Sequence, residues 1–540
     1  MAVAMEERLM SMLLANRNLV SVVLVLVAAV TAVALHYLIS SRRHHARRLP
    51  PGPMSLPVIG HLHLLRSPVH RTLRDLADRA GPLMHIRLGS THCVVASNAE
   101  VARELIRGHE GSISDRPLTE VARQFAYGGS SFVFAPYDAY WRFIKRLCMS
   151  ELLGPLAIEL HRPVRRAGAA SLLRAVLEAA NGGEKAVDLT HELIRFSHTS
   201  VLRMIAGTAA VPGSVASKAR EVVKDAAELV GAFNAEDYIA VCRGWDPQGL
   251  RRRAAAVHVR YDALLEEMIR HKEKAREASK LLGDLVGSGD KDSAAAAARK
   301  DMLDILMDKA EDKTAELKLT REKIKSFIID VMIGGSDTMA TMVEWMLAEL
   351  LNHPECLRKV VAEIDGVVGG GRIVGEEDLP QLPYLMAAYK ETLRLHPPAP
   401  VTHRQSSEEM EIRGFAIPQG TMVFINIWAI GRDPAFWEDP LAFVPERFMP
   451  GGAAEGMNIR GQQFQLMPFG SGRRGCPGMG LALQSVPAML AALVQCFHWS
   501  VAAGGGMPLD MGESDGLVCA RKEPLVLRPT PRLNPFPAVV

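Results

Sequence analysis

Apolar residues recur every three or four positions along most of the chain, which is the spacing of amphipathic helices. This spacing predicts helices at His70–Ala80, Ala99–Arg107, Tyr140–Leu153, Val164–Ala180, Ala254–Ala275, Lys323–Leu351, Pro354–Val367, Leu385–Leu395 and Met479–Phe497. Shorter apolar runs predict strands at Met84–Leu88, Cys93–Ala96, Thr421–Ile427 and Leu525–Leu527. We therefore expect a mainly helical fold with a small β part.

The helical pattern continues without an internal repeat from residue 61 to residue 540, so we expect one globular body over that range. Three stretches rich in Gly, Ser, Asp or Pro predict loops within it: Gly283–Ala298, Gly366–Arg372 and Pro450–Gly456. The first of these is expected to be a mobile connection on the surface.

An uncharged apolar stretch, Leu19–Ile39, precedes the body and is long enough to cross a membrane as one helix. Arginines cluster in the SRRHHARR segment that follows it, whereas the N-terminal flank balances Arg with Glu. The positive-inside rule then places residues 1–18 in the lumen and the body in the cytosol. A cleaved signal peptide is the alternative, but a basic cluster stands where a small-residue cleavage site would be needed.

Residues 40–60 join this anchor to the body through the proline-rich segment LPPGPMSLPVIG, Leu49–Gly60. Proline cannot continue a helix and favours a stiff, extended chain. We predict a basic and proline-rich hinge that orients the body against the membrane.

Composition narrows the function classes. The 540 residues are 48% hydrophobic and 23% charged, as in a folded chain. Because 63 Lys and Arg face 60 Asp and Glu, and no basic stripe stands out, a nucleic-acid partner is not expected. The seven cysteines are an odd number without a CxxC pair, which excludes a disulfide scaffold and a zinc ribbon.

One cysteine, Cys476, lies in a glycine-rich segment, FGSGRRGCPG, just before the predicted helix that begins at Met479. Glycine permits the tight turns of such a loop, and the free N–H groups of a helix start, together with Arg474, favour a thiolate. A thiolate on a tight loop is suited to be an axial ligand of haem iron, because sulfur donates electron density to the iron and favours O–O cleavage. A lone cysteine is more often structural, but here the surrounding positions are constrained as well: Phe469, Gly472, Arg474 and Gly478.

The pattern FxxGxRxCxG in this segment resembles the haem-binding signature of the cytochrome P450 superfamily at every fixed position, and the resemblance extends from the hinge to the C-terminus. It implies a cytochrome P450 fold, mainly α with a small β domain behind a single-pass membrane anchor. It also implies haem b as cofactor, Cys476 as the iron ligand, and O2-dependent monooxygenase activity. No GxGxxG dinucleotide motif is present, so the electrons of NADPH are expected from a separate NADPH–cytochrome P450 reductase.

The long predicted helix carries IGGSDTMAT, Ile333–Thr341, with two adjacent glycines that cost about 1 kcal/mol each in a helix. Thr338 is four residues after Gly334, so its hydroxyl could donate a hydrogen bond to the Gly334 carbonyl. This bond would loosen the helix and open a groove. A glycine pair for helix crossing is the alternative. The resemblance implies that Asp337 and Thr338 relay protons during oxygen activation, and Met339 stands where the family more often has a hydroxyl residue.

A second set of residues is expected to hold the cofactor. Trp141 and Lys145, in YWRFIKR, are one helical turn apart, so an indole N–H and a cation could bind a propionate. An amphipathic helix with an exposed lysine is the alternative. The resemblance adds Arg404, Phe469 and Arg474 to this set, and it implies an arginine where this chain has Lys145, so a two-pronged contact becomes a point charge.

A third set is implied to be structural. Glu391 and Arg394, in KETLR, share one helix face and would by themselves be an ordinary surface pair. The resemblance joins them with Arg447, in PERF, as a buried network behind the haem that serves folding and haem retention.

Three strings resemble the plant group that contains flavanone 2-hydroxylases, haem-type flavone synthases and isoflavone synthases: WRFIKRLCMSELL, FNAEDYI and LALQSVPAMLAALVQCFHW. The resemblance implies hydroxylation of a flavanone such as naringenin at C2 in flavonoid biosynthesis, at the endoplasmic reticulum membrane and beside other flavonoid-pathway enzymes. C2–C3 desaturation to a flavone, or hydroxylation of another phenolic, is the alternative. Phe125, Phe233 and Val401 are candidate substrate-wall positions, and each is equally compatible with plain core.

Two other classes stay open at this point. A haem-thiolate isomerase acting on hydroperoxides would need no reductase, and the acid–alcohol pair Asp337–Thr338 argues against it. An inactive haem protein that scaffolds a membrane pathway is the non-enzyme alternative, and the intact signature argues against it.

Overall fold

The computed structural model describes residues 48–207, 213–286, 300–314, 317–502 and 506–533, with scattered positions between 20 and 35. Residues 1–18, most of the predicted anchor 19–39 and the basic half of the hinge therefore lie outside the described residues. Of the helices described, α18 (Met479–Cys496) is apolar and long enough to cross a membrane, but 67% of it is buried inside the body, as in a core helix.

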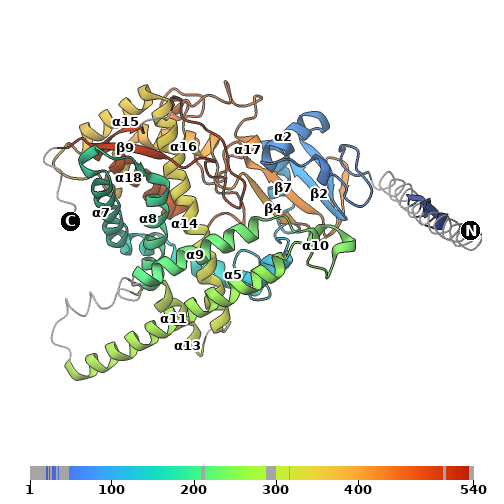
Figure 1. Cartoon of the computed structure of the whole chain (residues 1–540), viewed down its shortest axis with the longest axis horizontal. Helices are drawn as coiled ribbons and strands as arrows, with labels where there is room; N and C mark the ends of the chain where they lie inside the picture. The colour runs from blue at the N-terminus through green and yellow to red at the C-terminus, as the bar shows by residue number, and fades with distance from the viewer. Residues whose placement is uncertain are drawn as a thin grey trace, which may run out of the picture.

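Helices make up most of the body (Figure 1). Beside α18 they are α2 (Val69–Ala80), α3 (Ala99–Arg103), α4 (Glu120–Phe125), α5 (Ala139–Leu147), α6 (Pro155–Leu160), α7 (Arg162–Ala179), α8 (Leu189–Ala206), α9 (Gly213–Gly231), α10 (Ala235–Tyr238), α11 (Leu250–Val286), α13 (Met302–Glu311), α14 (Arg321–Asn352), α15 (Pro354–Val367), α16 (Pro383–Leu395) and α17 (Ile427–Ile430).

The strands form two small sheets and a hairpin. The first sheet has the order β1 (Leu83–Leu88), β2 (Thr91–Ala96), β7 (Met422–Asn426), β4 (Val401–Gln405), and only β2 and β7 run parallel. The second has the order β3 (Val187–Asp188), β9 (Val526–Pro531), β8 (Phe497–Val501), and the hairpin pairs β5 (Met410–Ile412) with β6 (Phe415–Ile417). The first sheet and α2 occupy one end of the body and the helical layer the other (Figure 1).

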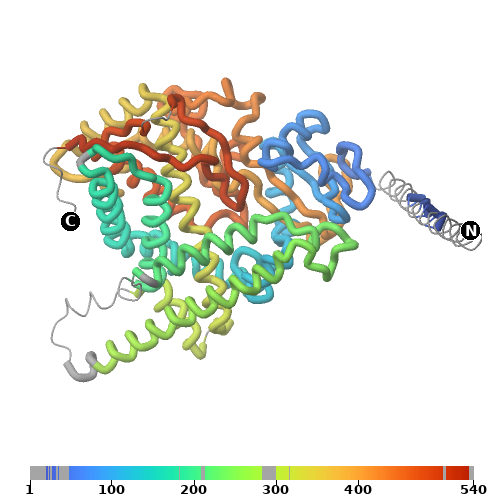
Figure 2. Tube along the Cα trace, in the orientation of Figure 1, coloured from blue at the N-terminus to red at the C-terminus, as the bar shows by residue number. Residues whose placement is uncertain are grey.

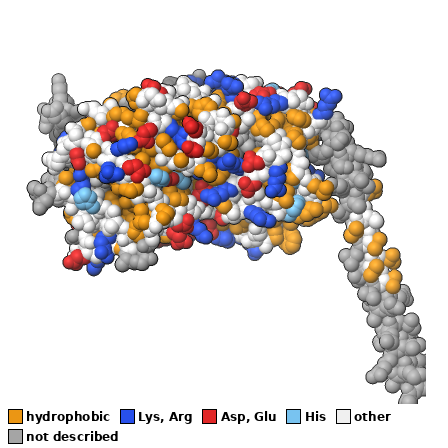
Figure 3. Space-filling model, turned by 90° about the horizontal axis from the view of Figure 1, so that it is seen from above, with side chains coloured by type: hydrophobic (Ala, Val, Ile, Leu, Met, Phe, Trp, Pro, Cys, Tyr) orange, Lys and Arg blue, Asp and Glu red, His pale blue; other side chains and the backbone are white. Residues whose placement is uncertain are grey.

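Helix α14 runs through the middle of the largest apolar cluster, and its C-terminal half is buried on every side. Helix α8 crosses it, and α16 and α18 pack on it as well. The trace in Figure 2 also shows the C-terminal strands, in red, beside the much earlier α7, in teal. Over the face shown in Figure 3, charged side chains of both signs are interspersed.

The helices and loops predicted from the sequence agree with the structure in part, and the differences have physical reasons. Helix α15 has the predicted bounds, whereas α8 and α9 were not predicted. In α8 the buried face includes Ser197, His198 and Ser200, and these polar residues interrupt the apolar spacing that marks a helix. The predicted loop Gly283–Ala298 begins as the last turn of α11, and the rest of it lies outside the described residues.

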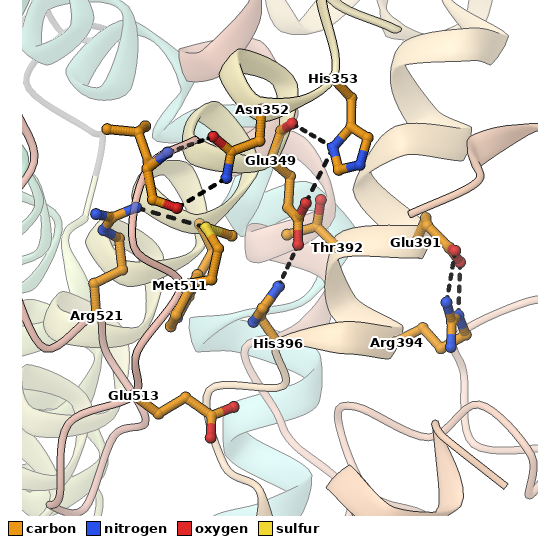
Figure 4. A network of polar contacts seen from close by, with 12 residues as sticks. Glu349, Asn352, His353, Glu391, Thr392, Arg394, His396, Met511, Glu513 and Arg521 are labelled. Carbon is orange, nitrogen blue, oxygen red and sulfur yellow. Dashed lines mark hydrogen bonds and ion pairs between the residues drawn. The ribbon is translucent and has the colours of Figure 1, made fainter. Parts of the chain in front are cut away.

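A polar network ties the end of α14 to the residue that joins it to α15 and to the segment after α16 (Figure 4). The Glu349 carboxylate accepts a hydrogen bond from His396 Nε2 at 2.6 Å and lies 3.3 Å from His353 Nδ1. Burial disfavours the charged form of Glu349, but its bonds to the two histidines outweigh burial and hold its pKa at about 2, and the pKa of His353 is raised by the same contact. Glu349 is therefore a carboxylate that stabilises the fold at neutral pH.

Replacing Glu349 with Gln is expected to destabilise the fold by about 3 kcal/mol near pH 6, and by less in acid. Since the pKa of Glu349 is lower in the folded than in the unfolded chain, its contribution is present above about pH 4.5 and is lost as pH falls toward about 2. Urea unfolding of both proteins between about pH 6 and about pH 3.5 measures the difference. A difference that stays constant over this range would contradict the assignment.

Candidate functional site

The loop before α18 holds Cys476 in one conformation. The Cys476 N–H donates to the Phe469 carbonyl at 2.9 Å and closes the loop on itself. Of the four glycines predicted to permit tight turns, Gly470 and Gly472 have positive φ, +70° and +69°. A Cβ at Gly472 would stand 2.3 Å from a carboxylate oxygen of Glu110, so this turn has no room for a side chain.

The Cys476 side chain faces interior space. It is accessible, yet protein atoms surround it closely enough for desolvation to raise the pKa of its thiol. An accessible group that is also desolvated lines a cavity inside the body rather than the outer surface. His403 on β4 shows the same combination, and desolvation lowers its pKa to about 4.

The expectation that the protein itself favours a Cys476 thiolate needs correction. The N–H groups of Gly478 and Met479 and the charges of Lys145 and Arg116 do lower the pKa of the thiol, but desolvation is the larger effect and the pKa is raised overall. Arg474, which we expected beside the sulfur, is not among the groups that act on it most strongly. A bound metal cation deprotonates a coordinating thiol outright, so iron would supply what the protein does not.

Four cations surround the same interior space: Arg116, Lys145, Arg404 and Arg474. Arg404 is 4% exposed, and its Nη1 has no hydrogen-bond partner among the described residues. Desolvation and the neighbouring charges of Arg116 and Arg474 hold the pKa of Arg404 well below its usual value. Burying several cations together costs free energy unless an anion pairs with them. The two propionates of haem are such anions. The donors present therefore fit haem.

The residues predicted to bind the haem propionates differ in how far their own hydrogen bonds leave them available. Lys145 Nζ donates to the Gly475 carbonyl at 2.9 Å, directly beside the cysteine loop. Trp141 uses its indole N–H on the Phe132 carbonyl at 3.0 Å, and its ring lies 4.4 Å below the Arg474 guanidinium. Arg474 itself donates to backbone carbonyls, of which that of Ser114 is 2.6 Å away. Binding of a propionate by Trp141 and by Arg474 stays a prediction.

Helix α14 carries the predicted notch. Thr338 Oγ1 donates to the Gly334 carbonyl at 2.8 Å, so this predicted hydrogen bond is confirmed. A Cβ at Gly334 would meet nothing within 4 Å, whereas one at Gly335 would touch Val201 of α8 at 3.5 Å. One glycine therefore borders open space, and the other serves a helix crossing. Met339, which stands where the family more often has a hydroxyl residue, is buried in the largest apolar cluster.

Asp337 has a partner that the sequence did not indicate. Its Oδ1 accepts a hydrogen bond from Nε2 of His198 on α8 at 2.8 Å, and the His198 side chain is 3% exposed. The same stretch of α8 is fixed to α14 by Ser197, which donates to the Ser336 carbonyl at 2.6 Å. The acid of the acid–alcohol pair is therefore held from a second helix.

Glu391, Arg394 and Arg447 lie together in the interior. Arg394 makes two hydrogen bonds of 2.7 Å to the Glu391 carboxylate, and both side chains are 0% exposed. Arg447 Nε is 3.4 Å from the same carboxylate. Arg394 also donates to three carbonyls, those of Gly431, Pro440 and Ala442, so the network holds the segment after α17 against α16.

The three candidate substrate positions have different exposures and neighbours. Phe125 is buried and stacks on Tyr261 in the largest cluster. Phe233 is 46% exposed and stacks on Tyr238. Val401 begins β4 and packs against the small cluster between the first sheet and α2. The role of all three in substrate binding stays a prediction.

Sequence reasoning missed Arg116 and His198. An isolated bridge between Asp115 and Gln405 sets Arg116 beside Arg404, and no local pattern predicts a pairing between such distant segments. A different trio that could hold a metal ion, His70, Glu513 and Cys519, is also buried together. There Glu513 already accepts hydrogen bonds from His70, Arg71 and Trp428, so this trio is a satisfied polar network.

Comparison with known proteins agrees with this site. The family model described as "Cytochrome P450" matches residues 50–528. The chain is 67% identical over 494 residues to "Cytochrome P450 93G1" of Oryza sativa subsp. japonica, covering 92% of each chain. It is 41% identical to "3,9-dihydroxypterocarpan 6A-monooxygenase" of Glycine max, covering 95% of this chain and 99% of the relative.

Among solved structures, a zebra fish cytochrome P450 with progesterone has the same fold, with a TM-score of 0.72 at 22% identity, covering 86% of this chain and 100% of that one. The family uses haem and O2 and takes the electrons of NADPH from a reductase. With the signature loop, the cation cluster and the notched helix all in place, this chain belongs to the cytochrome P450 family and is a monooxygenase of its plant 93 group.

Proposed function

We propose that the enzyme hydroxylates a flavanone such as naringenin at C2, in the biosynthesis of flavonoids. The observation that carries the proposal is the 41% identity, over 95% of the chain, to a relative named for monooxygenation of a dihydroxypterocarpan, which is a phenolic polycycle. The plant strings at Trp141–Leu153, Phe233–Ile239 and Leu481–Trp499 support the same substrate class.

The reaction consumes one flavanone, one O2, one NADPH and one proton, and yields the 2-hydroxyflavanone, water and NADP+. Haem, when bound, supplies the activation of O2 by electrons from the reductase. Cys476 Sγ would hold the iron, and the cations Arg116, Lys145 and Arg404 would hold the propionates. Thr338 Oγ1, which donates to the Gly334 carbonyl, would pass on a proton. Asp337, whose carboxylate accepts a hydrogen bond from His198, would deliver the next proton to Thr338.

Replacing Thr338 with Ala is expected to lower product formation by about 10²-fold, because a positioned proton carrier contributes at least that much. NADPH consumption should continue, with hydrogen peroxide released in place of product. The ratio of product to NADPH consumed measures this loss.

Thr338→Ser is the matched control, since it keeps the Oγ1 that bonds to Gly334. It should restore most of the ratio. Normal coupling in the Ala variant would show that the hydroxyl carries no proton.

A direct assay tests the substrate. Purified protein, reductase and NADPH are incubated with naringenin under ¹⁸O2, and the products are identified by mass. One labelled oxygen in the product supports C2 hydroxylation, whereas loss of two hydrogens without label indicates desaturation to the flavone. Turnover without NADPH, or no change of naringenin at all, would contradict the proposal.

We also propose that the protein is anchored in the endoplasmic reticulum membrane by residues 19–39, with the body in the cytosol beside other flavonoid-pathway enzymes. Exposed apolar side chains near the start of the body support this location: Met54, Leu56, Val58, Val241 and Trp245. These side chains come from residues 54–58 and from residues 241–245. The two segments approach one another at the β1–β2 turn, where Gly60 bridges to Leu88 and the Ser90 N–H donates to the Tyr238 carbonyl. Removal of residues 1–39 should shift the protein from the membrane fraction toward the soluble fraction.

A further inference from the structure

A cleft of about 280 Å³ lies between α7, α8 and α9. Three arginines line it, Arg195, Arg203 and Arg220, and no acidic side chain is among the described residues that line it. Arg195 pairs with Glu192 at 2.5 Å. Within the described ranges, Arg203 and Arg220 have no ion-pair partner, and the intervening sequence Gly-Thr-Ala-Ala-Val-Pro of residues 207–212 supplies no acid. The cleft therefore carries uncompensated positive charge.

The helices direct these charges into one space. Arg195 and Arg203 are eight residues apart on one face of α8, about 12 Å along its axis, and Arg220 comes from α9. Gly213, the first residue of the 19-residue α9, lines the same cleft. The N–H groups of a first helical turn lack partners within the helix and carry the positive end of its dipole.

A buried hydroxyl makes the second, independent observation. Ser200 is 3% exposed and lines the cleft, and its Oγ has no hydrogen-bond partner in the described part of the chain. Arg203 Nε is likewise buried and unpartnered among these residues. A Cβ at Gly168 of α7 would stand 2.6 Å from the Ser200 Oγ, so a side chain at this position would crowd the hydroxyl. Unmade hydrogen bonds of buried groups are costly, and an oxyanion would accept all of them.

We propose that this cleft binds a soluble oxyanion, namely a small phosphate-bearing molecule. Arg203 and Arg220 supply the charge, and Ser200 and the start of α9 supply further donors. The site is separate from the haem site, because α8 uses its other residues, His198 and Val201, to contact α14. The cleft helices α7 and α8 lie at the end of the body opposite α2, which follows the first residues of the body (Figure 1). This position favours a soluble molecule over a lipid headgroup.

Inorganic pyrophosphate is the probe, titrated calorimetrically into the holoenzyme at low salt. One equivalent is expected to bind, more weakly as salt rises. Arg203→Gln and Arg220→Gln should each weaken binding by about tenfold or more, and Ser200→Ala by about threefold to tenfold. Arg166→Gln removes an exposed arginine of α7 that lies outside the cleft lining and should leave binding unchanged. All variants should keep the reduced carbon-monoxide spectrum of the parent.

Several results would overturn the proposal. Absence of pyrophosphate binding to the parent at about 10 mM would do so, as would equal affinity in the Arg220→Gln and Ser200→Ala variants. Binding of vesicles containing phosphatidic acid that depends on Arg203 and Arg220, without binding of pyrophosphate, would assign the cleft to a membrane surface instead. If Arg203→Gln does not fold, the Arg220 and Ser200 variants decide the matter. The flavanone assay is independent of this test.

Discussion

Replacing Cys476 with Ser is expected to abolish the thiolate-type band of the reduced carbon-monoxide difference spectrum and to lower monooxygenase turnover by about 10³-fold or more, as removal of an essential group does. The fold itself should be little affected, because the side chain is accessible and serine is close to cysteine in size. The free energy of unfolding of the haem-free chain should therefore change by less than about 1 kcal/mol.

Cys519 provides the matched control, since it is the cysteine in the other potential metal-binding trio. Cys519→Ala should keep the band and the turnover, because Glu513 of that trio is already satisfied by protein donors. A band that survives in Cys476→Ser and disappears in Cys519→Ala would reverse the ligand assignment.

The second large effect is expected at Glu391. In Glu391→Gln two buried cations, Arg394 and Arg447, lose the carboxylate between them, and removal of one partner from such a pair costs about 3–5 kcal/mol. Because Arg394 also holds the segment after α17, haem retention should fall together with stability. Urea unfolding and the haem content per purified chain measure the two effects.

The exposed pair of Glu159 and Arg162 has the same spacing in sequence and serves as control. Glu159→Gln should cost no more than about 1 kcal/mol, the usual value for a surface pair. If Glu391→Gln costs as little, the buried network is dispensable for the fold.

Local chemistry was predictable from the residues themselves, whereas long-range pairing was predictable only where the family resemblance supplied it, as for Arg447 with Glu391. The bond from Thr338 to Gly334 spans one helical turn, and the cysteine loop is fixed by its own glycines, so both were accessible to sequence reasoning. Arg116 joins the cation cluster only through the pairing of Asp115 with Gln405. Nothing local distinguishes it from the other lysines and arginines of the chain.

Contacts between distant segments also decide where two other side chains, His198 and Phe233, lie. His198 is one polar residue on a helix whose buried face is itself partly polar, and it acquires meaning only when α8 crosses α14 beside Asp337. Phe233 stacks on Tyr238 at a half-exposed position, and its place in a substrate wall stays a prediction. Tertiary contacts, which residue type alone does not supply, decide where such a side chain lies.

The first sheet has a mechanical consequence. Gly60 bridges to Leu88 of β1, and from there β1, β2, β7 and β4 follow in hydrogen-bonded order to Arg404. Four strand spacings of about 4.8 Å separate the first residues of the body from this cation, or about 19 Å across a stiff ladder. Such a ladder is stiff in its plane, so the position of Arg404 relative to the first residues of the body is set by backbone hydrogen bonds rather than by a flexible tether.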